Sequence, residues 1–224
     1  MNRSVVQQLI LKDWRLHRMH MILSIAGGVL ALAMLQVRTE TTAILGGIWF
    51  FVALIVLGSM LPTSNILNER KKQTLPFLMS LPISATQYTM AKIVSTAGMF
   101  LGPWLALLIA MVTLIATRPD IPKGLIPMTI ILAGLTLVGF CLIAGAAVIS
   151  ESEGWTIAAT VVCNSSYGFM WYLMGRIPEV SAATKSAALV WSPAELTILG
   201  AEAATIVVIL GLALYVQSRK RDFI

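Results

Sequence analysis

The sequence predicts an all-α membrane protein with six transmembrane helices and an amphipathic helix at its N-terminal end. Two observations predict this class. Of the 224 residues 58% are hydrophobic and only 12% are charged, whereas a soluble domain carries about 25% charged residues. Six segments also approach the roughly 20 apolar residues that a helix needs to cross a bilayer. So few charges leave too little polar surface for a protein that faces water on all sides.

The six apolar segments are separated by prolines, helix caps and charged residues. The clearest boundary is at Ser192, where a proline follows at the first helical position and Glu195 stands three residues on. That order is typical of a capping box at the start of a helix. The predicted spans are residues 20–36, 44–66, 93–117, 125–149, 156–174 and 194–217, of which the second, third and fourth contain no charged residue.

Residues 1–19 differ from the spans because apolar and polar side chains alternate there at helical spacing. This pattern predicts an amphipathic helix that lies in the plane of the lipid headgroups. An ordinary basic flank before the first span is an alternative, and a signal peptide cleaved after Ala31-Leu32-Ala33 is another. The apolar positions are Val5, Val6, Leu9, Ile10, Trp14 and Leu16, and the polar ones are Gln7, Gln8, Lys12, Asp13 and Arg15.

Lys and Arg residues predict the orientation of the chain. With six spans both termini lie on one side, and that side would hold eleven of the 16 basic residues. Because cytoplasmic loops carry the excess of Lys and Arg, we expect both termini, the 68–92 loop and the basic tail at 218–224 to be cytoplasmic. The net charge of +6 then faces anionic lipid, and no nucleic acid is needed to explain it. The eleven residues are Arg3, Lys12, Arg15, Arg18, Arg70, Lys71, Lys72, Lys92, Arg219, Lys220 and Arg221.

Residues 68–92 form the one long polar interval in the first half of the chain. Pro76 and Pro82 bracket the short apolar piece Phe77–Leu81, and Ser84 is a suitable cap for a new helix that enters the third span. The pattern predicts a short helix across the cytoplasmic surface, with one apolar side that packs on lipid, on the bundle or on another protein. A loop anchored in the interface is the simpler alternative.

This stretch resembles the signature of ABC-2 type permeases, the membrane subunits of a class of ATP-driven exporters. The resemblance implies a coupling helix that docks in a cleft of a cytoplasmic ATPase. Two positions depart from the family pattern: Gln73 stands where a glycine is common, and Ala85 where a basic residue is common. The motif runs through Glu69-Arg70-Lys71-Lys72-Gln73-Thr74, Leu78-Met79-Ser80-Leu81-Pro82-Ile83-Ser84 and Tyr88-Thr89-Met90-Ala91-Lys92.

Carried over to this chain, the resemblance implies a permease domain at 20–217 that works with two ABC ATPase subunits and a second permease chain, most simply an identical one. It implies a multi-pass protein of the bacterial inner membrane. No Gly-x-x-x-x-Gly-Lys-Ser/Thr phosphate loop occurs in the sequence, so ATP hydrolysis is expected in the partner. The residues expected at the ATPase contact are Glu69, Arg70, Thr74, Phe77, Leu78 and Leu81.

Two other polar positions are candidates for the translocation path. Glu202 lies about two turns inside the sixth span, and an ionisable group at that depth faces the bundle interior or a wet cavity. Asn164 and Ser165 belong to the most polar patch within any span. For Glu202 the alternative is an outer-leaflet position reached by water, and for Asn164 and Ser165 it is hydrogen bonding between helices.

We expect no catalytic residue, cofactor or metal site in this chain. An integral membrane enzyme should show clustered His, Asp or Cys residues at one depth, and a proton-coupled carrier should show several buried carboxylates. A membrane assembly or signalling subunit of the same fold, without transport, stays open as an alternative, and so does the proton-coupled carrier. Cys141 and Cys163 both lie in apolar segments, where a thiol behaves mainly as a small hydrophobic group.

Overall fold

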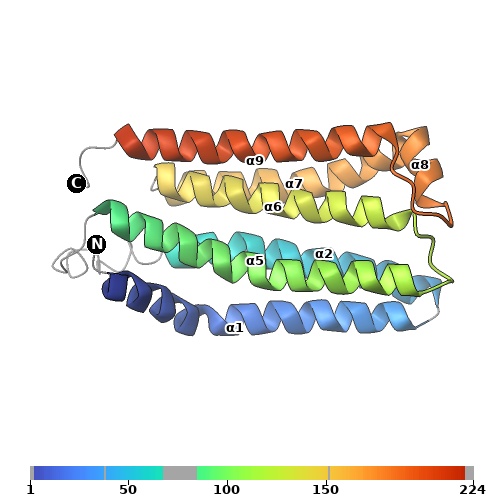
Figure 1. Cartoon of the computed structure of the whole chain (residues 1–224), viewed down its shortest axis with the longest axis horizontal. Helices are drawn as coiled ribbons and strands as arrows, with labels where there is room; N and C mark the ends of the chain where they lie inside the picture. The colour runs from blue at the N-terminus through green and yellow to red at the C-terminus, as the bar shows by residue number, and fades with distance from the viewer. Residues whose placement is uncertain (1–2, 38, 68–84, 151, 220–224) are drawn as a thin grey trace.

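The computed structural model is a bundle of long helices, and no strand occurs among the residues it describes, which are 3–37, 39–67, 85–150 and 152–219. Successive long helices run in opposite directions, so that the bundle has two ends (Figure 1). We call the end where α1 begins the N-terminal end. The helices are α1 (Arg3–Gln36), α2 (Glu40–Pro62), the π-helix η1 (Thr63–Leu67), α5 (Ala85–Thr117), α6 (Leu125–Ser150), α7 (Glu153–Arg176), α8 (Pro178–Thr184) and α9 (Pro193–Arg219).

Five helical segments are long and apolar enough to cross a membrane. They confirm five of the six predicted spans by length and composition. The predicted span 156–174 lies in α7, which has 24 residues but is not apolar enough to be counted among the five. The qualifying segments are Gln7–Gln36, Glu40–Ile66, Met90–Thr117, Leu125–Ser150 and Pro193–Val216.

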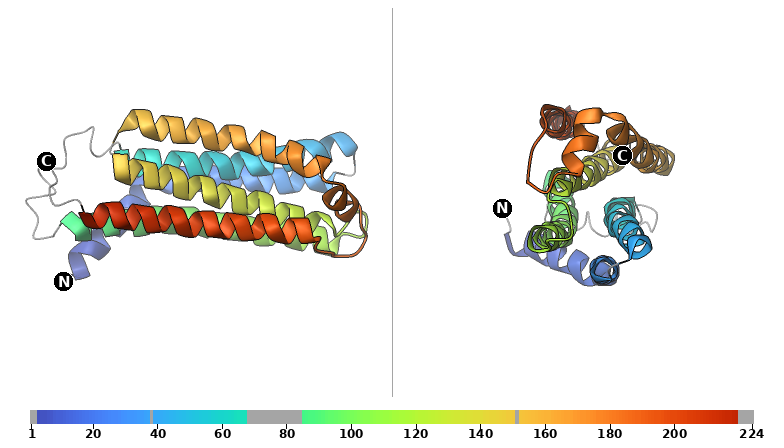
Figure 2. Two further views of the ribbon diagram at one scale, coloured as in Figure 1. Left: turned by 90° about the horizontal axis from the view of Figure 1, so that it is seen from above. Right: turned by 90° about the vertical axis from the view of Figure 1, so that its right-hand side faces the viewer.

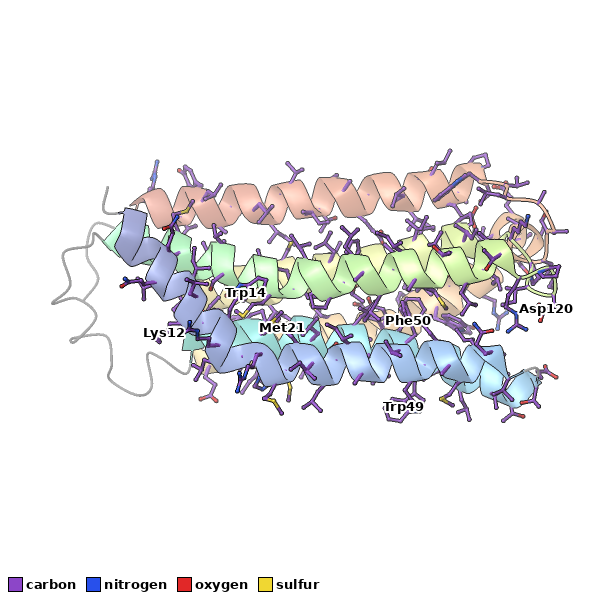
Figure 3. The ribbon with its side chains drawn as sticks, turned by 60° about the horizontal axis from the view of Figure 1, so that its bottom comes forward. Lys12, Trp14, Met21, Trp49, Phe50 and Asp120 are labelled. Atoms are coloured by element: carbon purple, nitrogen blue, oxygen red, sulfur yellow. The ribbon has the colours of Figure 1, made fainter. Side chains whose placement is uncertain are left out.

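The N-terminal amphipathic helix and the first span are one continuous helix of 34 residues, α1. The expected boundary near residue 19 is not a helix end, because neither proline nor glycine interrupts the chain there. The first turns of α1 are nevertheless inclined to the rest of the helix and cross the beginning of α5 (Figure 3). Their position in the headgroup plane stays a prediction.

The centre of the bundle is α6, which contacts α2, α5, α7 and α9. The rings of Phe100 and Phe140 stack there, with their centroids 4.3 Å apart and their planes within 4° of parallel. Gly58 makes room for this stack, because a Cβ on it would lie 3.2 Å from Phe100. On α2, Phe50 points into the bundle and is fully buried, whereas Trp49 points away from it (Figure 3).

Helix α9 lies at the edge of the bundle against α6, with most of its surface exposed (Figure 2). Its start is the predicted capping box. The Ser192 backbone N–H donates to Glu195 Oε2 at 2.8 Å, and the Glu195 N–H donates to Ser192 Oγ at 3.2 Å. The two residues thereby satisfy backbone groups that a helix end would otherwise leave unpaired.

Candidate functional site

An ion pair between α1 and α5 lies buried near the N-terminal end of the bundle. Lys92 Nζ is 2.8 Å from Asp13 Oδ1, and the two side chains are 5% and 1% exposed. Asp13 Oδ2 accepts a second hydrogen bond from Ser95 Oγ at 2.8 Å. The pair therefore fastens the inclined first turns of α1 to the beginning of α5.

Asn65 extends this cluster to the end of α2. Its amide oxygen accepts from Lys92 Nζ at 3.0 Å, and its amide nitrogen donates to Ser95 Oγ at 3.1 Å and to Thr96 Oγ1 at 2.8 Å. Asn65 is fully buried and belongs to the π-helix η1. Short π-helical turns occur frequently at functional sites, and here the turn carries the amide into contact with α5.

We call Asp13, Asn65, Lys92, Ser95 and Thr96 the polar cluster. Its two buried charges are stable only if their polar atoms are all hydrogen-bonded. Removing two charges from water is expensive, and their attraction offsets that only when further hydrogen bonds satisfy the remaining polar atoms. Here Asp13 and Lys92 neutralise each other and the neighbouring amide and hydroxyl groups bond to both. The cluster is therefore a fixed joint between α1, η1 and α5.

The polar cluster brings together residues from both sides of the segment 68–84. Asn65 lies three residues before that segment, and Lys92 lies about two turns inside α5, the helix that follows it. The predicted ATPase-contact residues themselves lie outside the described residues: they are Glu69, Arg70, Thr74, Phe77, Leu78 and Leu81.

Glu202 is a second buried acidic side chain, set in the first half of α9. It is 6% exposed, and neither carboxylate oxygen has a hydrogen-bond partner among the described residues. A Cβ on Gly134 of α6 would lie only 2.3 Å from Glu202 Oε2, so the carboxylate fills the space that this glycine leaves open. An ionisable group without partners in such a place is a candidate functional group.

The structure does not bring the other two predicted path residues to Glu202. Asn164 and Ser165 lie on the exposed face of α7. Tyr167, from the same polar patch, faces α6 instead, and its hydroxyl donates to the Leu132 carbonyl at 2.8 Å.

Comparison with known families decides the identity of the chain. Residues 8–218 match the family model described as ABC-2 family transporter protein. The chain belongs to the ABC-2 transporter family. No curated protein and no solved structure matches it significantly. The ABC-2 match begins within α1 and ends within α9, so it includes the polar cluster and Glu202.

Family membership supports a multi-pass membrane protein with a transport permease role. The residues that the structure describes include no group of three or more His, Cys, Asp or Glu side chains that could hold a metal ion. Cys141 and Cys163 are both buried free thiols, which agrees with their interpretation as small hydrophobic groups.

Sequence reasoning missed most of the polar cluster in this ABC-2 protein. The sequence places Lys92 in the predicted coupling segment, but it indicates Asp13 only as one polar position of an amphipathic helix. A lone acidic residue in the basic run Lys12-Asp13-Trp14-Arg15 was the available indication that it needs a cationic partner. For Asn65 the sequence contains no such indication, because an amide near the end of a span can equally well lie in the headgroup region.

Proposed function

We propose that this ABC-2 protein is the permease subunit of an ATP-driven exporter and is coupled to separate cytoplasmic ATPase subunits. The observation that carries the proposal is the polar cluster at the roots of the 68–84 segment, within a chain whose family match spans residues 8–218. A segment bound by an ATPase can move a helical bundle only if the residues that flank the segment are firmly attached to the bundle. The Asp13–Lys92–Asn65 contacts provide such a fixation for three helical elements at once.

The proposed topology has six spans, with the N-terminal end of the bundle in the cytoplasm. Five spans come from the long apolar helices, and α7 is proposed as the sixth. In support, α7 runs beside α6 (Figure 2), and its 24 residues would extend about 36 Å at 1.5 Å per residue, enough for a bilayer core. The excess of Lys and Arg at this end supports the orientation.

The proposed mechanism is a lever. Closure of two ATPase subunits would displace a coupling helix within 68–84, and the displacement would enter the bundle through η1 and α5. Because Lys92 of α5 binds Asp13, the inclined part of α1 would move with them. Two copies of the chain rocking against each other would then expose the path to alternate sides, which requires a bistable interface between packed helices.

The test is co-purification with an ATPase. A neighbouring reading frame that encodes an ATPase with a phosphate-binding loop should be co-expressed with wild-type permease, with Glu69→Ala and with Arg70→Ala. Both variants should fold, yet lose stimulated ATP hydrolysis and export together. Glu179→Ala, which removes an exposed charge at the opposite end, is the control and should leave both unchanged. Unaltered hydrolysis and export in both loop variants would contradict the coupling assignment.

A proton-coupled carrier of the same fold is the second candidate, and the buried carboxylate of Glu202 is the observation that favours it. Transport in vesicles that continues without ATP and stops when a protonophore is added would support the carrier. Transport that needs ATP and persists with the protonophore would support the exporter.

A further inference from the structure

The burial pattern of α9 singles out its acidic side chains. Among the α9 side chains that the structure describes, only Glu195 and Glu202 are buried, although these are the residues whose burial costs most. They stand seven residues apart and so share one face of the helix. The capping box accounts for Glu195, because its Oε2 accepts two hydrogen bonds from Ser192, and only its Oε1 lacks a partner among the described residues. Glu202 has no such explanation.

Glu202 occupies a niche that fits its carboxylate but offers it nothing to bind. Gly134 makes the space, because any side chain there would collide with Glu202 Oε2. Within the described part of the chain, neither a hydrogen bond nor an ion pair reaches either oxygen. A cavity-filling side chain would be expected to be apolar, so a carboxylate at this position indicates a binding role.

The same turn of α6 engages polar side chains from two further helices. Trp104 Nε1 of α5 donates to Thr136 Oγ1 at 2.8 Å, and Tyr167 of α7 donates to the Leu132 carbonyl. The Trp104 N–H, the Tyr167 O–H and the Thr136 O–H, which donates to the Ala133 carbonyl at 2.6 Å, are therefore all committed to groups of α6. The counter-charge for Glu202 has to come from outside this set of groups.

We propose that Glu202 binds the cationic group of an amphiphilic organic cargo, a lipophilic cation. The inference rests on the proposed function and names the substrate class of its path. A metal ion would need several more oxygen ligands, and Glu195 is about 10 Å away along the helix at 1.5 Å per residue. Both α7 and α9 carry exposed apolar side chains, Val161 and Leu196 among them, so a cargo that approaches this side of the bundle would need a mostly apolar surface.

The experiment measures binding of tetraphenylphosphonium, a permanently charged lipophilic cation, to the full chain in nanodiscs of phosphatidylcholine. The matched anion tetraphenylborate has nearly the same size and shape. We expect saturable binding of the cation by the wild type and none of the anion. Glu202→Gln should weaken cation binding about tenfold or more, because a close buried charge partner is lost.

Glu195→Gln is the matched control, because it removes a buried carboxylate from the same helix while glutamine still completes a capping box. It should bind the cation like the wild type. Glu202→Asp keeps the charge and should keep more binding than Glu202→Gln, so the result does not depend on one variant. Equal cation affinity in wild type and Glu202→Gln, or wild-type binding that never saturates, would overturn the inference.

The proposed function is assayed separately on the same preparations by co-purification with the ATPase. If Glu202→Gln retains ATPase association while the wild type fails to bind the cation, the cargo class is wrong and the exporter proposal stands. If the wild type binds the cation but never associates with an ATPase, the exporter proposal fails and the cation site stands.

Discussion

The polar cluster and Glu202 both place ionisable side chains inside an apolar bundle, but they differ in whether those side chains have partners. Asp13 and Lys92 meet at 2.8 Å, and Asn65, Ser95 and Thr96 complete their hydrogen bonds. Glu202 lies against Gly134 with both oxygens unpaired among the described residues. A completed network holds helices together, whereas a buried carboxyl group without partners lowers stability, which is consistent with the proposed ligand.

The two regions also differ in the helices that they join. The polar cluster links α1, η1 and α5, which flank the segment 68–84, so changes there should alter both stability and the transmission of movement. Glu202 lies in the seam between α9 and α6, and α9 is held to the bundle mainly along α6. Changes at Glu202 should therefore alter binding more than folding, and opposite signs of stability change are expected for the two regions.

The largest effect is expected from Lys92→Met. The substitution keeps an unbranched side chain but leaves the carboxylate of Asp13 buried without its cation, which is typically destabilising by about 3–5 kcal/mol. The free energy of unfolding should fall by that amount, measured by titration with sodium dodecyl sulfate in mixed micelles.

The double variant with Asp13→Leu and Lys92→Met is the control for this prediction. It removes both charges, so no unpaired ion remains, and much of the lost stability should return. A double variant as unstable as the sum of the two single variants would show that the ion pair is not the reason for the loss.

An intermediate effect is expected from Gly134→Ala. The new Cβ would approach Glu202 Oε2 to 2.3 Å. The carboxylate at the end of this flexible side chain then has to turn away, at a cost near the lower end of the roughly 1–3 kcal/mol that is typical of overpacking. Thermal unfolding in detergent should show a lower midpoint than for the wild type. The same substitution in a Glu202→Ala background should cost much less, and equal losses in both backgrounds would place the strain elsewhere.

The smallest effect, and one of opposite sign, is expected from Glu202→Leu. Because the carboxylate is buried without partners, an apolar side chain of similar length should raise the free energy of unfolding by ~1 kcal/mol. The dodecyl sulfate titration used for Lys92→Met measures it. A clear loss of stability would mean that Glu202 has a stabilising partner, and the contrast between the two regions would disappear.

The all-helical class and the limits of some helices could be predicted from the sequence. The predicted spans 125–149 and 194–217 are the helices Leu125–Ser150 and Pro193–Arg219. Apolar runs of this length leave few alternatives, because backbone groups in lipid have to be satisfied within the helix itself. The capping box before α9 was predictable for a local reason, since its residues are three positions apart in the sequence.

The sequence predicted less well where one continuous helix begins in a polar stretch, and where a helix is less apolar than the others. A change in polarity near residue 19 suggested two elements, but helix hydrogen bonds continue through a polarity change, and α1 is unbroken. In α7 the polar residues Asn164 and Ser165 lower the hydropathy of a helix that is otherwise as long as its neighbours. The coupling residues from Glu69 to Leu81 stay predictions.

By itself the sequence determined the membrane class, the position of the helices, the capping box and the family signature, because each depends on residues close together along the chain. The tertiary structure alone decided which charges meet. Asp13 and Lys92 are 79 positions apart and bond only because α1 crosses α5, whereas Glu202 finds Gly134 but no partner. Hydrogen bonds and ion pairs act over a few ångströms, so whether a buried charge is satisfied depends on packing between helices rather than on sequence distance.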